Sequence, residues 1–197
     1  MQVGLTGGIG SGKSTAASLL VECGAVLVDT DAISRALTAR GGAALPALAT
    51  AFGPQVIGTD GALDRERMRA LVFSDPAAKA RLEAILHPMI GENARAQAAA
   101  ASGRPVVFDV PLLAESAHWR ARVDRVLVVD CSEDTQVQRV AQRNGWAEDA
   151  VRRVIAQQAS RARRRAIADA VIFNDGLSLD ELGSEVRALW SRWRPIT

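Results

Sequence analysis

The sequence predicts an α/β fold in which helices flank a five-stranded parallel sheet, with one long and one short helical insertion. Short valine-rich runs, which are typical of buried strands, recur along the 197 residues. Stretches rich in alanine, leucine and arginine with helical spacing lie between and after these runs. This alternation implies a parallel sheet that is covered by helices.

The expected strands are apolar runs, most of which are followed by a polar or glycine-containing turn. They cover residues 2–5, 25–28, 105–108, 123–129 and 170–173. The clearest expected helices cover residues 14–22, 135–143 and 179–193.

The interval between the second and third expected strands is long, at about 75 residues. A single crossover helix cannot fill it. Its sequence combines several helical stretches with breakers, among them Gly53-Pro54, Asp75-Pro76 and His87-Pro88. We therefore expect a helical insertion here, and a shorter one over residues 139–168 between the fourth and fifth strands.

Composition excludes several classes of protein. The chain carries 24 basic and 22 acidic side chains, a net charge of +2, and 48% of its residues are hydrophobic. This composition supports a packed core and excludes a disordered chain. No apolar stretch approaches the roughly 20 residues that cross a bilayer, so we expect no membrane association.

The N-terminal segment and the cysteines indicate the compartment. The segment lacks the basic lead and the cleavage site of a signal peptide, so we expect a cytoplasmic protein. Cys23 and Cys131 are too few for a disulfide framework and lack the spacing of a zinc site. We expect both to be buried thiols.

The strongest motif is GGIGSGKS at residues 7–14, which matches G-x-x-x-x-G-K-[ST] between an expected strand and an expected helix. Glycines let successive backbone N–H groups point at one phosphate, and the helix adds its positive end. Lys13 is expected to reach the β- and γ-phosphates, Ser14 to ligate Mg²⁺, and Thr15 to lie beside the α-phosphate. We predict a P-loop NTPase core whose nucleotide site comprises Gly8, Gly10, Ser11, Gly12, Lys13, Ser14 and Thr15.

The rest of the chain narrows the class of P-loop protein. Lysine occurs only at positions 13 and 79, so the chain lacks the Asn-Lys-x-Asp motif by which GTPases recognise guanine. A small-molecule kinase needs an acceptor lobe, a base near the acceptor hydroxyl, and mobile arginines that neutralise the transferring phosphoryl group. The chain offers candidates for all three.

Carboxylates follow the second and third expected strands, at the sheet edge where parallel sheets bind ligands. Asp29 or Asp31 could accept the acceptor's proton, and either could instead cap the helix that follows. Asp109 resembles a Walker B acid that holds Mg²⁺ directly or through water, and the alternative is a turn cap.

An arginine-rich segment lies between Asp149 and Asp169 and contains no acid. It could be a lid that closes on phosphates, a basic helix that binds nucleic acid, or a solvated helix face. We expect Arg143, just before the segment, and Arg161 to contact ligand. The scattered tryptophans form no base-stacking platform, so we expect no nucleic-acid partner. The arginines are Arg152, Arg153, Arg161, Arg163, Arg164 and Arg165.

Two weaker signals stay open from the residues alone. His87 precedes Pro88, and a histidine before a helix-starting proline is typical of a cap or packing residue. Leu112 and Leu113, which follow the third strand, could line an acceptor pocket or belong to the core.

An ordered set of motifs spans almost the whole chain. It runs through residues 5–15, Asp29-Thr30-Asp31, residues 62–65 (ALDR), His87-Pro88, residues 110–115 (VPLLAE), Gln138-Arg139, Gln142-Arg143, Gln157-Gln158, Arg161 and residues 168–176 (ADAVIFNDG). This set closely resembles the dephospho-coenzyme A (dephospho-CoA) kinase family.

The resemblance implies transfer of the γ-phosphoryl group of ATP to the ribose 3′-hydroxyl of dephospho-CoA, the last step of coenzyme A synthesis, with Mg²⁺. It implies that Asp31 is the general base and that Arg143 and Arg161 contact phosphates. Together with Lys13 of the phosphate loop, Asp31 and Arg143 are the expected catalytic residues. It places Asn174 and Gly176 at the adenine. The expected substrate-binding residues are Thr6, Asp31, Arg65, His87, Leu112 and Leu113.

The resemblance also implies three functional parts. These are a nucleotide-binding core (1–31, 103–138 and 169–197), a helical substrate domain (32–102) and a lid (139–168). We expect a monomer, with a weak homo-oligomer as the alternative. Two other functions stay open: a nucleoside monophosphate kinase-like transferase with another acceptor, and a noncatalytic nucleic-acid-binding module.

Overall fold

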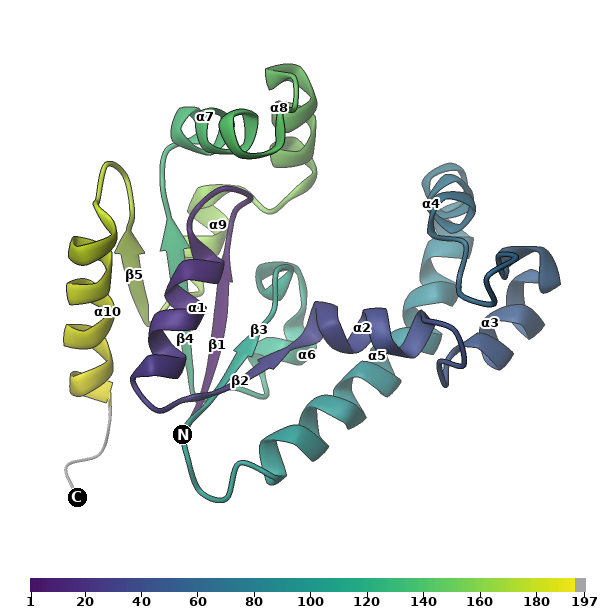
Figure 1. Ribbon diagram of the computed structural model, residues 1–197, viewed down its shortest axis with the longest axis horizontal. Coiled ribbons are helices and arrows are strands. Elements are labelled where there is room, and N and C mark those ends of the chain that lie inside the picture. Colours follow the sequence, from purple (N-terminus) through teal and green to yellow (C-terminus); the bar gives the residue numbers. More distant parts are fainter. Residues whose placement is uncertain (194–197) are drawn as a thin grey trace. The chain divides into compact units, whose positions relative to one another are not determined.

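The computed structural model describes residues 1–193 and contains a five-stranded sheet (Figure 1). The strand order is β2-β3-β1-β4-β5, and the pairs β1–β3, β1–β4 and β4–β5 are parallel. The expected α/β class is therefore confirmed. The strands are β1 (Gln2–Gly7), β2 (Val26–Asp29), β3 (Val106–Asp109), β4 (Arg125–Asp130) and β5 (Ala170–Phe173).

The main core lies between the sheet and two helices, α1 (Lys13–Glu22) and α10 (Leu179–Trp193). The strand residues Val3, Leu5 and Leu127 are fully buried there. These valine and leucine runs form central strands because both of their faces are covered. The Trp190 indole donates a hydrogen bond to the Cys23 carbonyl (3.2 Å), which joins the two helices.

Shorter elements complete this part of the molecule. Val137, Val140 and Val151 form a second buried cluster between α7 and α8, and Ile9 of the loop after β1 packs against it. This apolar stripe explains why the two helices pack on each other despite their charged outer faces. The elements are η2 (Leu113–Glu115), α6 (Ala117–Arg120), α7 (Glu133–Asn144), α8 (Glu148–Gln157) and α9 (Arg161–Ala166).

The chain divides into two compact units. The sheet unit comprises Met1–Val28 and the chain from Ala101 onward, and the helical unit comprises Asp29–Ala100. Within the helical unit, three helices pack against the long helix α5. Its elements are α2 (Thr30–Thr38), α3 (Leu45–Phe52), η1 (Pro54–Val56), α4 (Arg65–Ser74) and α5 (Pro76–Ala99). The functional division into core, substrate domain and lid stays a prediction, and residues 194–197 of the predicted core lie outside the described residues.

Two expectations from the sequence are wrong. His87-Pro88 neither breaks nor starts a helix, because Pro88 lies inside α5. A proline there loses one backbone hydrogen bond, but the packing of α2, α3 and α4 against α5 outweighs that loss. Cys131 is buried as expected, whereas Cys23 is only half-buried.

No helix within residues 1–193 is both long enough and apolar enough to span a bilayer.

Candidate active site

The phosphate loop links β1 to α1 and leaves the N-terminus of α1 without a side-chain cap. Gly12, at the cap position, has a φ of 95°, which is the left-handed region that glycine adopts without strain. The first turn of α1 contains no acidic residue. By contrast, Asp29, Asp64, Asp75, Ser132 and Ser160 cap α2, α4, α5, α7 and α9. The free N–H groups and positive end of α1 therefore suit an anionic ligand.

Lys13, the first residue of α1, forms an ion pair with Asp109 at the end of β3. Their side chains are 17% and 11% exposed. Asp109 is paired in register with Leu5 of β1, and this brings it to the same edge of the sheet as the loop. Ser14, the next residue, is exposed. The three residues predicted to meet phosphate and Mg²⁺ thus lie together.

Polar side chains from distant segments hold the backbone of the loop. The Asn174 amide, directly after β5, donates to the Ser11 carbonyl (2.8 Å). Gln158, directly after α8, accepts from the Ile9 N–H (3.1 Å). Arg139 of α7 donates to the Gly10 carbonyl (3.5 Å). These three hydrogen bonds hold the backbone of the loop in the conformation described here.

Gly8 lies against two buried side chains that the sequence analysis did not assign to the site. A Cβ at Gly8 would lie 2.8 Å from Nη2 of Arg164 and 2.9 Å from Oε1 of Gln136. Arg164 is 3% exposed and Gln136 is 0% exposed. Burial lowers the pKa of Arg164, and nearby Asp130 and Glu115 oppose this shift. A larger residue at position 8 would have to displace at least one of these side chains.

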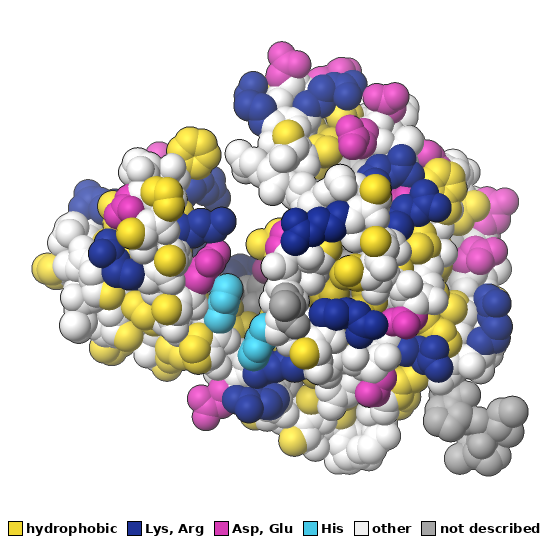
Figure 2. All heavy atoms as spheres, turned by 180° about the vertical axis from the view of Figure 1, so that it is seen from behind, with side chains coloured by type: hydrophobic (Ala, Val, Ile, Leu, Met, Phe, Trp, Pro, Cys, Tyr) yellow, Lys and Arg dark blue, Asp and Glu magenta, His cyan; other side chains and the backbone are white. Residues whose placement is uncertain are grey.

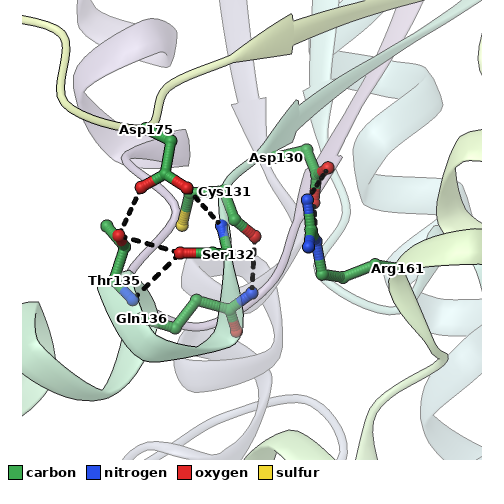
Figure 3. Close-up of polar contacts among 7 residues, drawn as sticks. All are labelled: Asp130, Cys131, Ser132, Thr135, Gln136, Arg161 and Asp175. Atoms are coloured by element: carbon green, nitrogen blue, oxygen red, sulfur yellow. Dashed lines mark hydrogen bonds and ion pairs between the residues drawn. The ribbon is translucent and has the colours of Figure 1, made fainter.

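Arg161, the first residue of α9, binds Asp130 at the end of β4 through two parallel hydrogen bonds (Figure 3). Nε lies 2.9 Å from Oδ1, and Nη2 lies 2.8 Å from Oδ2. The hydrogen bond to Asp130 raises the pKa of Arg161, against the opposing effect of burial. Arg143, the other predicted phosphate ligand, is exposed and donates from Nε to Asn144 Oδ1 (2.9 Å).

The β5–α10 loop is fastened to the start of α7 through Asp175 (Figure 3). Its carboxylate accepts hydrogen bonds from the Ser132 N–H (3.1 Å) and from the Thr135 hydroxyl. The bonds from Thr135 and then Ser132 are the main reasons why the pKa of Asp175 lies below its ordinary value. Asn174 and Gly176, the residues expected at the adenine, flank this fastened position.

The two candidate bases at the start of α2 differ in what their carboxylates do. Asp29 Oδ1 accepts from the Ala32 N–H (2.8 Å) and so caps α2. Asp29 Oδ2 lies 3.4 Å from Arg35 Nη2. Asp31 is exposed in the first turn of α2, and no described residue bonds its carboxylate. Of the two carboxylates, that of Asp31 is the one available to a ligand.

The other residues predicted to contact the substrate differ in how exposed they are. Arg65, the first residue of α4, is exposed and donates to the Thr38 hydroxyl (2.8 Å). His87 is exposed in the middle of α5. Leu112 is 54% exposed, whereas Leu113 is 1% exposed and belongs to the core.

Thr6, near the end of β1, was also predicted to contact the substrate. It is fully buried, and its hydroxyl donates to the Pro111 carbonyl (3.0 Å). A contact between Thr6 and the acceptor stays a prediction.

The arginine-rich segment is not one continuous basic surface. Arg152 pairs with Asp134 (3.3 Å), Arg161 pairs with Asp130, and Arg164 is buried. Figure 2 shows basic and acidic side chains mixed at the top of the view, where α7 and α8 lie. This mixing does not favour a phosphate-backbone footprint, which needs a stripe of one sign.

Comparison with known proteins gives the family of the chain. The model of the family described as dephospho-CoA kinase matches residues 1–180. The chain belongs to the dephospho-CoA kinase family. The dephospho-CoA kinase of Bordetella parapertussis is 57% identical over 98% of this chain and 90% of its own length. That of Burkholderia thailandensis is 56% identical over 97% and 94%.

A solved structure extends the agreement to the fold. The crystal structure of TT1252 from Thermus thermophilus is similar to this chain with a TM-score of 0.86 and 32% identity, over 99% of this chain and 98% of that one. The family assignment from the motifs is confirmed, and with it the expectation of an ATP-using kinase.

Sequence reasoning did not predict that Gln136, Gln158 and Arg164 lie against the phosphate loop, or that Asp130 binds Arg161. The contacts of Gln136, Gln158 and Arg164 with the loop join residues more than 100 positions apart, which spacing cannot reveal. One signal was available, because β2, β3 and β4 all end in aspartate. The same reasoning that singled out Asp29 and Asp109 applies to Asp130.

Proposed function

We propose that this chain transfers the γ-phosphoryl group of ATP to the ribose 3′-hydroxyl of dephospho-CoA, giving coenzyme A and ADP. Membership of the dephospho-CoA kinase family carries the choice of acceptor. The uncapped N-terminus of α1, with Lys13 in its first turn, supports the binding of a triphosphate. The helical unit, residues 29–100, supplies the candidate acceptor residues Asp31, Arg65 and His87.

Asp31 is the proposed general base. Its exposed carboxylate has no competing partner among the described residues, so it can accept a hydrogen bond from the 3′-hydroxyl and take the proton as the new bond forms. Asp29 is less suited to this role because it already caps α2. Orientation of the hydroxyl for in-line attack supplies much of the rate enhancement.

Positive charge around the loop is proposed to stabilise the transferring phosphoryl group. The ammonium group of Lys13 would turn from Asp109 to the β- and γ-phosphate oxygens. Arg143 is exposed, and among the described residues its side chain bonds only the neighbouring Asn144, so it can turn to a phosphate. Guanidinium groups suit this task because they donate in a planar fork.

Ser14 and Asp109 fit Mg²⁺. No group of three or more His, Cys, Asp or Glu side chains within residues 1–193 could hold a metal ion. Mg²⁺ does not need such a cage, because it keeps several waters and binds one or two protein oxygens together with substrate phosphates. The hydroxyl of Ser14 and the carboxylate of Asp109 would hold it beside Lys13. When bound, the ion would offset negative charge on the phosphate oxygens.

The decisive experiment measures ADP formation from ATP and Mg²⁺ with and without dephospho-CoA, together with mass spectrometry of the acceptor. We expect ADP to form in step with a gain of about 80 daltons on dephospho-CoA, the mass of one phosphoryl group. Parallel reactions with AMP and CMP test a monophosphate acceptor. ADP formation with a monophosphate but not with dephospho-CoA would overturn the proposal.

A further inference from the structure

Residues on both sides of Arg161 in the sequence contact the phosphate loop. Three residues earlier, Gln158 bonds the Ile9 N–H, and three residues later, Arg164 lies against Gly8. Asp130 follows Val129, which is paired in register with Gly7, the first glycine of the loop. The Asp130–Arg161 pair (Figure 3) is therefore flanked in the sequence by residues that contact the phosphate loop.

The guanidinium of Arg161 is held on two sides and open on a third. Asp130 takes Nε and Nη2, and the guanidinium carbon lies 5.8 Å from the centre of the Phe173 ring. Nη1 has no hydrogen-bond partner among the described residues, and the Arg161 side chain is 29% exposed. An arginine held in this way keeps one donor group free in a fixed direction.

The Asp130 side chain is 1% exposed, and removing a carboxylate from water costs free energy that its ion pair with Arg161 must offset. Buried ion pairs rarely stabilise a fold more than apolar residues of the same size would. The contrasting pair in the same region, Arg152 with Asp134, is 51% and 88% exposed and touches no part of the loop. Asp130 therefore differs from Asp134 in two ways: it is buried, and it binds its arginine through two hydrogen bonds.

We propose that Asp130 is a positioning residue that holds Arg161 so that its free Nη1 group meets a phosphate oxygen of the nucleotide. This inference rests on the proposed function for its kinetic readout. Asp130 itself contacts neither the nucleotide nor the acceptor, and it acts through Arg161. Pre-orientation matters because a misplacement of about 1 Å can cost about a hundredfold in rate.

The test is a double-mutant cycle of Asp130→Asn and Arg161→Ala, with kcat for dephospho-CoA phosphorylation as the readout. We expect each single variant to lower kcat at least about tenfold, and the double variant to be no slower than Arg161→Ala. Thermal unfolding should behave differently. Arg161→Ala leaves a buried carboxylate unpaired, so adding Asp130→Asn should raise its melting temperature while kcat stays the same.

Asp134→Asn is the matched control, because it removes the carboxylate of the exposed pair, and its kcat should equal that of the unchanged protein. Should Asp130→Asn fail to fold, Asp130→Glu keeps the charge, moves the carboxylate, and enters the same cycle. An unchanged kcat in the Asp130 variant, or losses that multiply in the double variant, would overturn the positioning role.

A second readout separates this inference from the function itself. Binding of a non-hydrolysable ATP analogue with Mg²⁺ is measured by calorimetry on the same four proteins. If the unchanged protein does not phosphorylate dephospho-CoA, the proposed function fails. The positioning role then stands only if both single variants weaken analogue binding by the same factor and the double variant weakens it no further.

Discussion

The phosphate loop and the start of α2 both present functional side chains, but they are held in different ways. Asn174, Gln158 and Arg139 each bond the backbone of the loop from a distant segment, and Gly8 packs against buried side chains. Asp31 has no such support. It lies exposed in the first turn of α2, which Asp29 caps.

This difference indicates which properties each region controls. The loop must be rigid before nucleotide arrives, because its N–H groups stabilise charge only when they are already aligned. A base needs only reach and an unpaired carboxylate. Substitutions in the loop should therefore alter both stability and turnover, whereas a substitution at Asp31 should alter turnover alone.

Lys13→Ala should give the largest effect. We expect turnover to fall at least about a hundredfold, because the variant loses the cation that faces the transferring phosphoryl group. The melting temperature should fall as well, because Asp109 loses its ion-pair partner. Steady-state kinetics and thermal unfolding measure the two effects. Lys79→Ala, which removes the only other lysine from an exposed pair with Glu83, is the control and should match the unchanged protein.

Asp31→Asn should also lower turnover at least about a hundredfold, the low end for loss of a positioned base. Its melting temperature and its affinity for ATP should stay unchanged, because no described residue bonds the carboxylate of Asp31. Asp29→Asn is the matched comparison, since asparagine caps a helix as well as aspartate does. A larger loss of turnover in Asp29→Asn than in Asp31→Asn would move the base to Asp29.

Asn174→Ala tests the support of the loop with a smaller effect. The variant leaves the Ser11 carbonyl without its donor, which should lower the free energy of unfolding by about 1–3 kcal/mol. The KM for ATP should rise because the loop is no longer fixed. Denaturant unfolding is compared with that of Asn93→Ala, which loses an exposed hydrogen bond within α5 and should change by less than about 0.5 kcal/mol.

Asp175→Asn should have the smallest effect on stability, and this effect should depend on pH. The folded state lowers the pKa of Asp175, so the ionised carboxylate stabilises the fold above its unfolded value of about 3.9. That contribution is lost as the pH falls through the folded pKa. The melting temperatures of the unchanged protein and of Asp175→Asn should therefore differ most near neutral pH, and the difference should shrink below about pH 4. A difference that does not change with pH would contradict this assignment.

The fold could be predicted well from local pattern. The five strands were placed within two residues at each end, because runs of valine bury both faces of a central strand. The helix α5 could not be predicted as one element, because Pro88 disfavours a helix locally and only packing against α2, α3 and α4 overcomes that preference.

The site was predictable where chemistry is local and unpredictable where it depends on contact. The motif GGIGSGKS contains both the glycine-rich turn and the start of the helix, so Lys13 and Ser14 could be assigned to the nucleotide site from their spacing. The roles of Asp29 and Asp31 could not be separated, because either position could cap α2, and only the bond to the Ala32 N–H distinguishes them. Arg164 looked like one of several surface arginines, yet it is buried against Gly8.

Gly12 combines two constraints that bear on drug resistance. Its positive φ strains any other residue, and a Cβ there would collide with the Asn174 amide that holds the loop. An inhibitor seated on this turn would therefore meet few escape mutations at Gly12, because a substitution that blocks the compound would also dislodge the support the enzyme needs to bind its own nucleotide.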